Sequence, residues 1–252
     1  MRRVAAALLL SALAFAGEPV TYQDGETRLA GYFAAPKGRN SLPAVVIIHQ
    51  WMGPTDHERR VADELAAVGY AAFVADIYGE TVRPKDSKEA GAQAGKFLGD
   101  RALYRQRIAA ALEALKARKE VNPLRLGVIG YCFGGTGALE AARAGMPVKG
   151  VVSFHGMLGA GPGPVPSITA KVLACHGADD PYVPPKDVAA FQAEMKQAKA
   201  DYVFVAYAGA VHAFTQKEAG DDPSRGAAYH EKAMKRSWGH MLQFLSEALV
   251  GK

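Results

Sequence analysis

Residues 126–135 read Leu-Gly-Val-Ile-Gly-Tyr-Cys-Phe-Gly-Gly, an apolar run that ends in a Gly-x-Cys-x-Gly-Gly turn. Small residues compatible with a helix follow it. A strand, a sharp turn and a helix in this order form a nucleophile elbow, here with cysteine where serine is commoner. Side chains at Gly130 and Gly134 would collide with the neighbouring strand and helix. The stretch therefore predicts that Cys132 lies at the carboxyl edge of a sheet, where the N-terminus of the next helix favours its thiolate form. The alternative is a glycine-rich turn with a buried, inert cysteine.

The rest of the chain indicates one α/β domain. It has 252 residues, of which 49% are hydrophobic, enough for a substantial core. Continuous apolar runs such as 44–48 and 71–76 are typical of strands covered on both faces, and they alternate with helical patterns. We predict an α/β-hydrolase-type fold over residues 17–252, with a single doubly wound, mostly parallel sheet flanked by helices.

Some segments carry weaker signals. Residues 27–34 alternate loosely and suit an antiparallel strand at the start of the sheet. Thr55 or Asp56 is expected to cap a helix that runs to Val68. Residues 80–99 are polar and rich in Gly and Ala, and we expect a loop with weak helix there.

The first 16 residues have the three parts of a secretory signal peptide. Met1-Arg2-Arg3 is basic, residues 4–14 are apolar, and Ala14-Phe15-Ala16 fits a cleavage site before Gly17. The apolar part is too short to be a stable membrane anchor. We therefore expect a periplasmic or secreted mature chain, the alternative being an ordinary N-terminal helix.

Charge and cysteine content argue against a nucleic-acid-binding protein and against a disulfide-stabilised one. The net charge falls from +5 to +3 without Arg2 and Arg3, which leaves 28 basic against 25 acidic residues. No Lys/Arg block stands out, so nucleic-acid binding is not expected. Two cysteines, Cys132 and Cys175, do not make a disulfide framework, and Cys175 is expected to be a small buried thiol. We expect a monomer or weak homodimer.

Polar clusters follow four of the predicted strands, at the edge where ligands bind in such sheets. They are His49-Gln50, Cys132, Asp179-Asp180 and His212. The order nucleophile, acid, histidine is that of α/β-hydrolases. A thiol needs a base or cation beside it, imidazole serves as both, and the imidazole needs a carboxylate to orient it.

These requirements assign catalytic roles to Cys132 as nucleophile, His212 as base and Asp180 as the orienting acid. Asp180 is chosen because it immediately precedes the turn, which Asp179 is expected to cap. The oxyanion hole should combine the backbone N–H of Phe133 with that of Trp51.

Three further histidines, His49, His155 and His176, also follow strands, an arrangement that could indicate a metal site. No HExxH or CxxC spacing exists and no acidic residues accompany them, so we interpret them as supporting or core residues and expect no metal.

Taken together, these residues resemble the dienelactone hydrolase family. The matching segments run in order through nearly the whole mature chain: 45–53, 75–79, 130–135, 177–184, 209–214 and Arg236-Ser237-Trp238. The resemblance implies a Cys-His-Asp triad, here Cys132, His212 and Asp180, that hydrolyses small-molecule esters or lactones without a cofactor. Within the matching segments we predict substrate contacts at Gln50, Tyr78 and Phe214.

Three positions depart from the family pattern. Gln50 stands where the family carries a Glu that helps control the thiol, and it cannot accept a proton. Glu80 and Gln216 stand where dienelactone-specific members carry substrate-binding arginines. An anionic substrate would lose both charge-assisted contacts unless Arg83 or Lys217 compensates. The family name is therefore not taken as the substrate.

Two functional hypotheses result. The first is a thiol esterase or lactonase that works through a thioester acyl-enzyme. The second is a catalytically weak or inactive periplasmic binding protein on the same fold, which the departures favour. A serine-type lipase or peptidase relative is disfavoured by the cysteine and by the absence of a long apolar lid.

Overall fold

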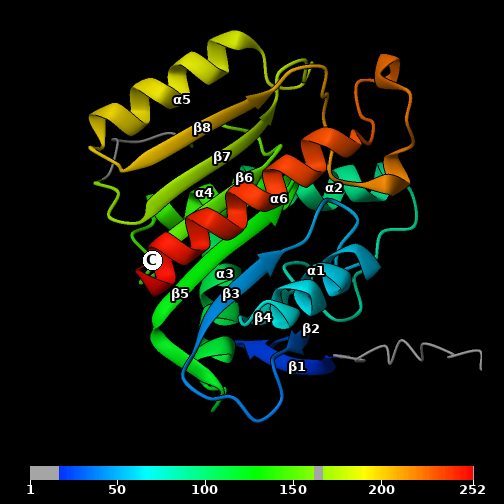
Figure 1. The fold of residues 1–252 in the computed structure, drawn as a ribbon. Helices are drawn as coiled ribbons and strands as arrows, with labels where there is room; N and C mark the ends of the chain where they lie inside the picture. Colours follow the sequence, from blue (N-terminus) through cyan, green and yellow to red (C-terminus); the bar gives the residue numbers. More distant parts are fainter. Residues whose placement is uncertain (1–16, 162–166, 252) are drawn as a thin grey trace, which may run out of the picture.

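The computed structural model describes residues 17–161 and 167–251, so the predicted signal peptide lies outside the described residues. One eight-stranded sheet forms its centre, in the order β1-β2-β4-β3-β5-β6-β7-β8 (Figure 1). Strands β1 and β2 pair antiparallel, as do β2 and β4, and the remaining neighbours pair in parallel. The strands are β1 Glu18–Asp24, β2 Thr27–Ala34, β3 Leu42–Ile48, β4 Ala71–Ala75, β5 Val121–Tyr131, β6 Gly150–Phe154, β7 Lys171–Gly177 and β8 Tyr202–Tyr207. The predicted fold class is confirmed.

Helices cover both faces of this sheet. They are α1 Asp56–Ala67, α2 Ser87–Gly99, α3 Arg101–Lys116, α4 Phe133–Arg143, α5 Pro185–Gln197 and α6 Glu231–Leu245, with two short 3-10 helices, η1 Lys217–Ala219 and η2 Pro223–Arg225, and a π-helix, η3 Ser246–Val250. Helices α1 and α6 lie on one face and α3 and α4 on the other (Figure 1). In the part of the chain that the structure describes, no helix is long and apolar enough to cross a membrane.

The sheet is buried on both faces because alternate residues of its central strands enter two different cores. In β3, Val45 and Ile47 pack with Leu65 of α1, whereas Val46 packs with Ile108 of α3 on the other side. Each fully buried aliphatic side chain of this size stabilises the fold by about 1.5–3 kcal/mol. This two-sided burial explains why the strands read as continuous apolar runs.

Residues 80–99 are expected to form a loop with weak helix, and the structure has a regular helix there, α2, over residues 87–99. Asp86 caps this helix by accepting hydrogen bonds from the backbone N–H groups of Lys88 and Glu89, each at 2.9 Å. Its buried residues are Ala90, Ala94 and Phe97. Small residues kept this apolar stripe faint in the sequence. The edge strand β1 was not predicted either, since Tyr22 is its one buried residue.

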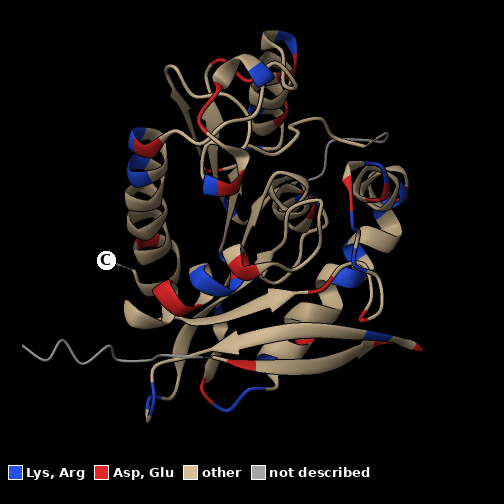
Figure 2. Ribbon diagram, turned by 90° about the vertical axis from the view of Figure 1, so that its right-hand side faces the viewer, with Lys and Arg blue, Asp and Glu red and all other residues tan. Residues whose placement is uncertain are grey.

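Charged side chains of both signs are interspersed over the helices and loops (Figure 2). One cluster is buried: the Arg143 guanidinium lies 2.6 Å from Glu194 Oε2 and 3.1 Å from Glu140 Oε1, and it ties α4 to α5. Removing one partner of such a buried pair typically costs about 3–5 kcal/mol. At the start of α1, Thr55 is the cap, in a capping box with Glu58.

Candidate active site

The turn between β5 and α4 is a nucleophile elbow. Cys132 has φ 54° and ψ −115°, a conformation that L-residues rarely adopt and that costs about 1–3 kcal/mol. A methyl group at Gly130 would overlap the carbonyl oxygen of Gly134, and one at Gly134 would overlap that of Ile48. The predicted requirement for glycine at both positions is confirmed.

Three loops at one edge of the sheet bring Cys132, His212 and Asp180 together. His212 Nε2 lies 3.1 Å from Cys132 Sγ, and His212 Nδ1 lies 2.8 Å from Asp180 Oδ2. Asp180 is buried, and its Oδ1 accepts a hydrogen bond from the Tyr182 N–H at 2.9 Å. The expectation that Asp179 caps this turn is wrong, because its carboxylate accepts from the Gly209 N–H instead.

The electrostatics of this set favour a charged imidazole. Burial alone would disfavour the charge, but hydrogen bonds and attraction from Asp180 and Cys132 outweigh it and raise the pKa of His212 to about 10. An imidazolium beside the sulfur stabilises a thiolate there. The ring is also held sterically, because Tyr182 and His155 both pack against it edge-on, with centroids 5.3 Å and 5.1 Å away.

The loop after β3 is fixed in front of the elbow. His49 pairs with the Gln50 carbonyl at 2.6 Å through Nδ1 and accepts the Ile77 N–H at 3.1 Å through Nε2. The Tyr78 hydroxyl donates to the Trp51 carbonyl at 2.9 Å. Within the described ranges, the backbone N–H groups of Trp51 and Phe133 have no acceptor. They are available as oxyanion donors, and that role stays a prediction.

The three residues predicted to contact substrate, Gln50, Tyr78 and Phe214, lie in different surroundings. Gln50 is buried, and its Oε1 accepts from the Met52 N–H at 3.1 Å, which shapes the loop. Tyr78 is buried against His49. Phe214 is fully buried and packs on His155 and Tyr207, so it belongs to the core and does not reach a surface open to substrate.

Two exposed apolar side chains near the site were missed. Met157 and Tyr182, 37% and 50% exposed, follow β6 and β7, and Trp51 is 37% exposed on the loop after β3. The Tyr182 ring contacts His212, and the Met157 backbone bonds Thr136, one turn into the elbow helix. Their position just after strand ends was the available signal.

Neither cation suggested as a compensating substrate contact is free for that role. The Arg83 guanidinium binds the Asp76 carboxylate at 2.9 Å and the carbonyls of Gly79 and Val82. Lys217 lines a cavity elsewhere. Neither Arg83 nor Lys217 therefore replaces the family arginines in this structure.

Three histidines that follow strands and the second cysteine are buried. Burial lowers the pKa of His49, His155 and His176, and it raises that of the Cys175 thiol to about 12. Over residues 17–161 and 167–251, no three His, Cys, Asp or Glu side chains are grouped to hold a metal ion.

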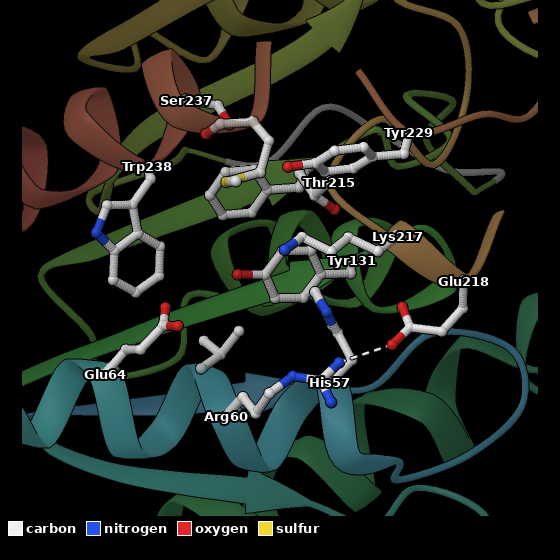
Figure 3. A pocket seen from close by; sticks show the side chains of 13 residues that line it. His57, Arg60, Glu64, Tyr131, Thr215, Lys217, Glu218, Tyr229, Ser237 and Trp238 are labelled. Atoms are coloured by element: carbon white, nitrogen blue, oxygen red, sulfur yellow. Dashed lines mark hydrogen bonds and ion pairs between the residues drawn. The ribbon is translucent and has the colours of Figure 1, made fainter. Parts of the chain in front are cut away.

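A cavity of about 460 Å³ lies between α1 and α6 (Figure 3). It is lined by aromatic side chains, including Tyr131, Tyr229 and Trp238, and by charged groups such as Arg60 and Glu218. Cys132, His212 and Asp180 are not among its lining residues. Thr215, on its wall, connects it to the elbow through His155.

The sheet order, the elbow and the order nucleophile, acid, histidine define an α/β-hydrolase. Comparison with known proteins agrees: an α/β-hydrolase from a Medee basin deep-sea metagenome library shares the fold at 17% identity and a TM-score of 0.65, with 93% of this chain and 99% of that chain covered. The model of the dienelactone hydrolase family matches residues 29–249. The chain belongs to this family and is a hydrolase that acts on lactones or esters.

Two relatives are more similar. A Bradyrhizobium protein named "Probable 2-oxo-3-(5-oxofuran-2-ylidene)propanoate lactonase" is 32% identical over 91% of this chain and 93% of its own length. A dienelactone hydrolase-like promiscuous phosphotriesterase from metagenomic libraries is 38% identical, with a TM-score of 0.87 over 92% of this chain and 98% of its own.

Proposed function

We propose that the protein hydrolyses uncharged carboxylic esters or lactones through a thioester acyl-enzyme on Cys132. The observation that carries this proposal is the continuous set of contacts from Cys132 Sγ to His212 Nε2 and from His212 Nδ1 to Asp180 Oδ2, at 3.1 Å and 2.8 Å. Nucleophile, base and orienting acid are thus in hydrogen-bond reach before substrate binds.

In the first half-reaction, the Cys132 thiolate attacks the carbonyl carbon and a C–S bond forms. The oxyanion receives hydrogen bonds from the N–H groups of Phe133 and Trp51, each worth about 3–4 kcal/mol in comparable sites. The tetrahedral intermediate collapses, the ester C–O bond breaks, and the proton on His212 Nε2 passes to the leaving oxygen. A thioester and a neutral His212 remain.

In the second half-reaction, His212 takes a proton from water as the water oxygen attacks the thioester carbonyl. The C–S bond then breaks, the acid is released and the thiolate–imidazolium pair is restored. Asp180 holds Nδ1 protonated throughout, so Nε2 always faces the sulfur and the incoming water.

Preference for uncharged substrates is supported by the charges around the site. Arg83 is bound to Asp76, and the apolar side chains of Trp51, Met157 and Tyr182 are exposed near the elbow. Such a surface favours acyl and alcohol groups that lose little hydration on binding.

Hydrolysis of p-nitrophenyl acetate, p-nitrophenyl butyrate and dihydrocoumarin by wild type and Cys132→Ala tests the proposal. We expect turnover of all three by wild type and none above background by the variant. Equal rates for the two proteins would refute the assignment, as would a preference for esters with a carboxylate beside the carbonyl.

For cellular setting and assembly, we infer a periplasmic or secreted monomer or weak homodimer without a stable membrane anchor. The three-part pattern of residues 1–16 supports export. Fractionation of the native host, N-terminal sequencing and sedimentation velocity test it. An N-terminus other than Gly17, a membrane-bound fraction or a tight oligomer would contradict it.

A further inference from the structure

His155 occupies a position that the mechanism above does not use. It is fully buried directly after β6, with φ 40°, and its backbone N–H donates to the Cys175 carbonyl at 2.8 Å. Its backbone thus continues the pairing with β7 while its side chain turns back toward the elbow. A non-glycine residue in this strained region is maintained only where its surroundings hold it.

The two ring nitrogens of His155 have different partners. Nδ1 lies 3.1 Å from the backbone nitrogen of Cys132, and Nε2 lies 2.8 Å from Thr215 Oγ1. Because a backbone N–H only donates, Nδ1 must accept and carries no proton. The neutral ring then has its proton on Nε2 and donates it to Thr215.

Through these contacts, His155 connects the turn that carries Cys132 with the loop that carries His212. The Cys132 N–H also donates to the Phe154 carbonyl at 3.0 Å, so the strained elbow is held from β6. Thr215 lies three residues after His212, on the loop that carries the imidazole. The ring of His155 also packs against the His212 ring itself.

Burial keeps the His155 ring neutral. It is the main cause that lowers the pKa of His155 well below its ordinary value, and repulsion from His212 and, to a smaller extent, from His57 and His176 acts in the same direction. Among the described residues, its ring nitrogens contact the Cys132 amide and the Thr215 hydroxyl and no carboxylate. Protonation would put N–H against N–H at Cys132, so the elbow contact requires the neutral ring.

We infer that His155 is a positioning residue, and that its hydrogen bonds to the Cys132 amide and to Thr215 hold the sulfur and the His212 imidazole at reacting distance. This inference rests on the proposed function for its kinetic consequence, but its geometric consequence can be measured without any substrate. Thr215 lines the cavity between α1 and α6, whose lining does not include Cys132, His212 or Asp180, so it can be substituted without changing the reacting groups.

The test compares Thr215→Val, which keeps the shape and removes the hydroxyl, with Thr215→Ser, which keeps the hydroxyl. His155→Phe keeps a ring and removes both nitrogens. Ser237→Ala is the matched control, because Ser237 is a buried hydroxyl in the same cavity that bonds only the Met234 carbonyl. Each protein is alkylated with iodoacetamide from pH 5 to 9, assayed with p-nitrophenyl acetate and unfolded in urea.

For Thr215→Val we expect kcat to fall about five- to tenfold, the change that loss of one buried hydrogen bond produces, with KM within twofold. The midpoint of Cys132 alkylation should move to higher pH, because a misplaced imidazolium stabilises the thiolate less. His155→Phe should show a larger loss, whereas Thr215→Ser and Ser237→Ala should match wild type within twofold.

Alkylation profiles and kcat within twofold of wild type in both Thr215→Val and His155→Phe would overturn the inference, even if both variants are less stable. A wild type that hydrolyses no ester, yet shows the predicted alkylation shifts in the variants, would refute the proposed function and leave the positioning role supported.

Discussion

Asp180→Asn is the substitution that isolates the orienting acid. Asn keeps the size of the side chain and an oxygen that can accept from the Tyr182 N–H. It removes the negative charge 2.8 Å from His212 Nδ1. It also offers an N–H to that nitrogen, which favours the tautomer with the proton on Nε2 and leaves no lone pair for the Cys132 proton.

The size of the effect follows from the contact that is lost. A buried hydrogen bond to a charged group is worth about 1.5–3 kcal/mol, which corresponds to a loss of roughly ten- to 150-fold in kcat. The equivalent change in a serine triad costs about 10⁴. We expect a smaller loss here because a thiol ionises more readily than a hydroxyl and depends less on its base.

The assay is kcat and KM for p-nitrophenyl butyrate, with iodoacetamide alkylation at pH 7 in parallel. Asp179→Asn is the matched control, since Asp179 is the adjacent acid but binds the Gly209 N–H and not His212. The reasoning is refuted if Asp180→Asn retains wild-type kcat within twofold, or if Asp179→Asn loses as much.

Three further predictions concern stability and the thiol. Gly134→Ala should lower the free energy of unfolding, measured in urea, by about 3 kcal/mol or more, because the added methyl group overlaps the Ile48 carbonyl. Gly95→Ala, in α2 with open space around it, should raise it by about 0.5–1 kcal/mol. Equal effects of the two substitutions would contradict the elbow geometry. Gln50→Glu puts a carboxyl group on the loop that lies against the elbow; its negative charge disfavours the thiolate and should slow alkylation of Cys132 at pH 7 about tenfold, and faster alkylation would contradict this. In the folded protein the pKa of His212 is raised to about 10, so its contribution to stability is full below pH 6.5 and is lost as pH rises toward 10. The urea midpoint of wild type should therefore fall over this pH range, and that of His212→Gln should not. An equal fall in both proteins would refute this prediction.

The sequence allowed prediction of much of the fold because its strands are buried on both faces and therefore read as uninterrupted apolar runs. Helix α2 was predicted only as weak helix because two of its three buried residues are alanines and Gly91 and Gly95 interrupt it. Its stability comes from the Asp86 cap and from packing of Phe97, and tertiary packing of this kind leaves no local periodicity.

The residues of the site were predictable to the extent that they follow strands with a common carboxyl edge. This placed Cys132, Asp180 and His212 together. The buried position of Phe214 and the contact between His155 and Thr215 were not predictable, because both depend on how the loop after β8 folds back over β6. Local sequence carries no signal for such a long-range contact.

The central claim is that the acyl group passes through Cys132. The direct measurement is peptide mass spectrometry after acid quenching during turnover of p-nitrophenyl butyrate. The account predicts a peptide containing Cys132 heavier by one butyryl group, with unmodified Cys175, and no such species in Cys132→Ala. Steady turnover with no acyl group on Cys132, or with the acyl group on another residue, would contradict it.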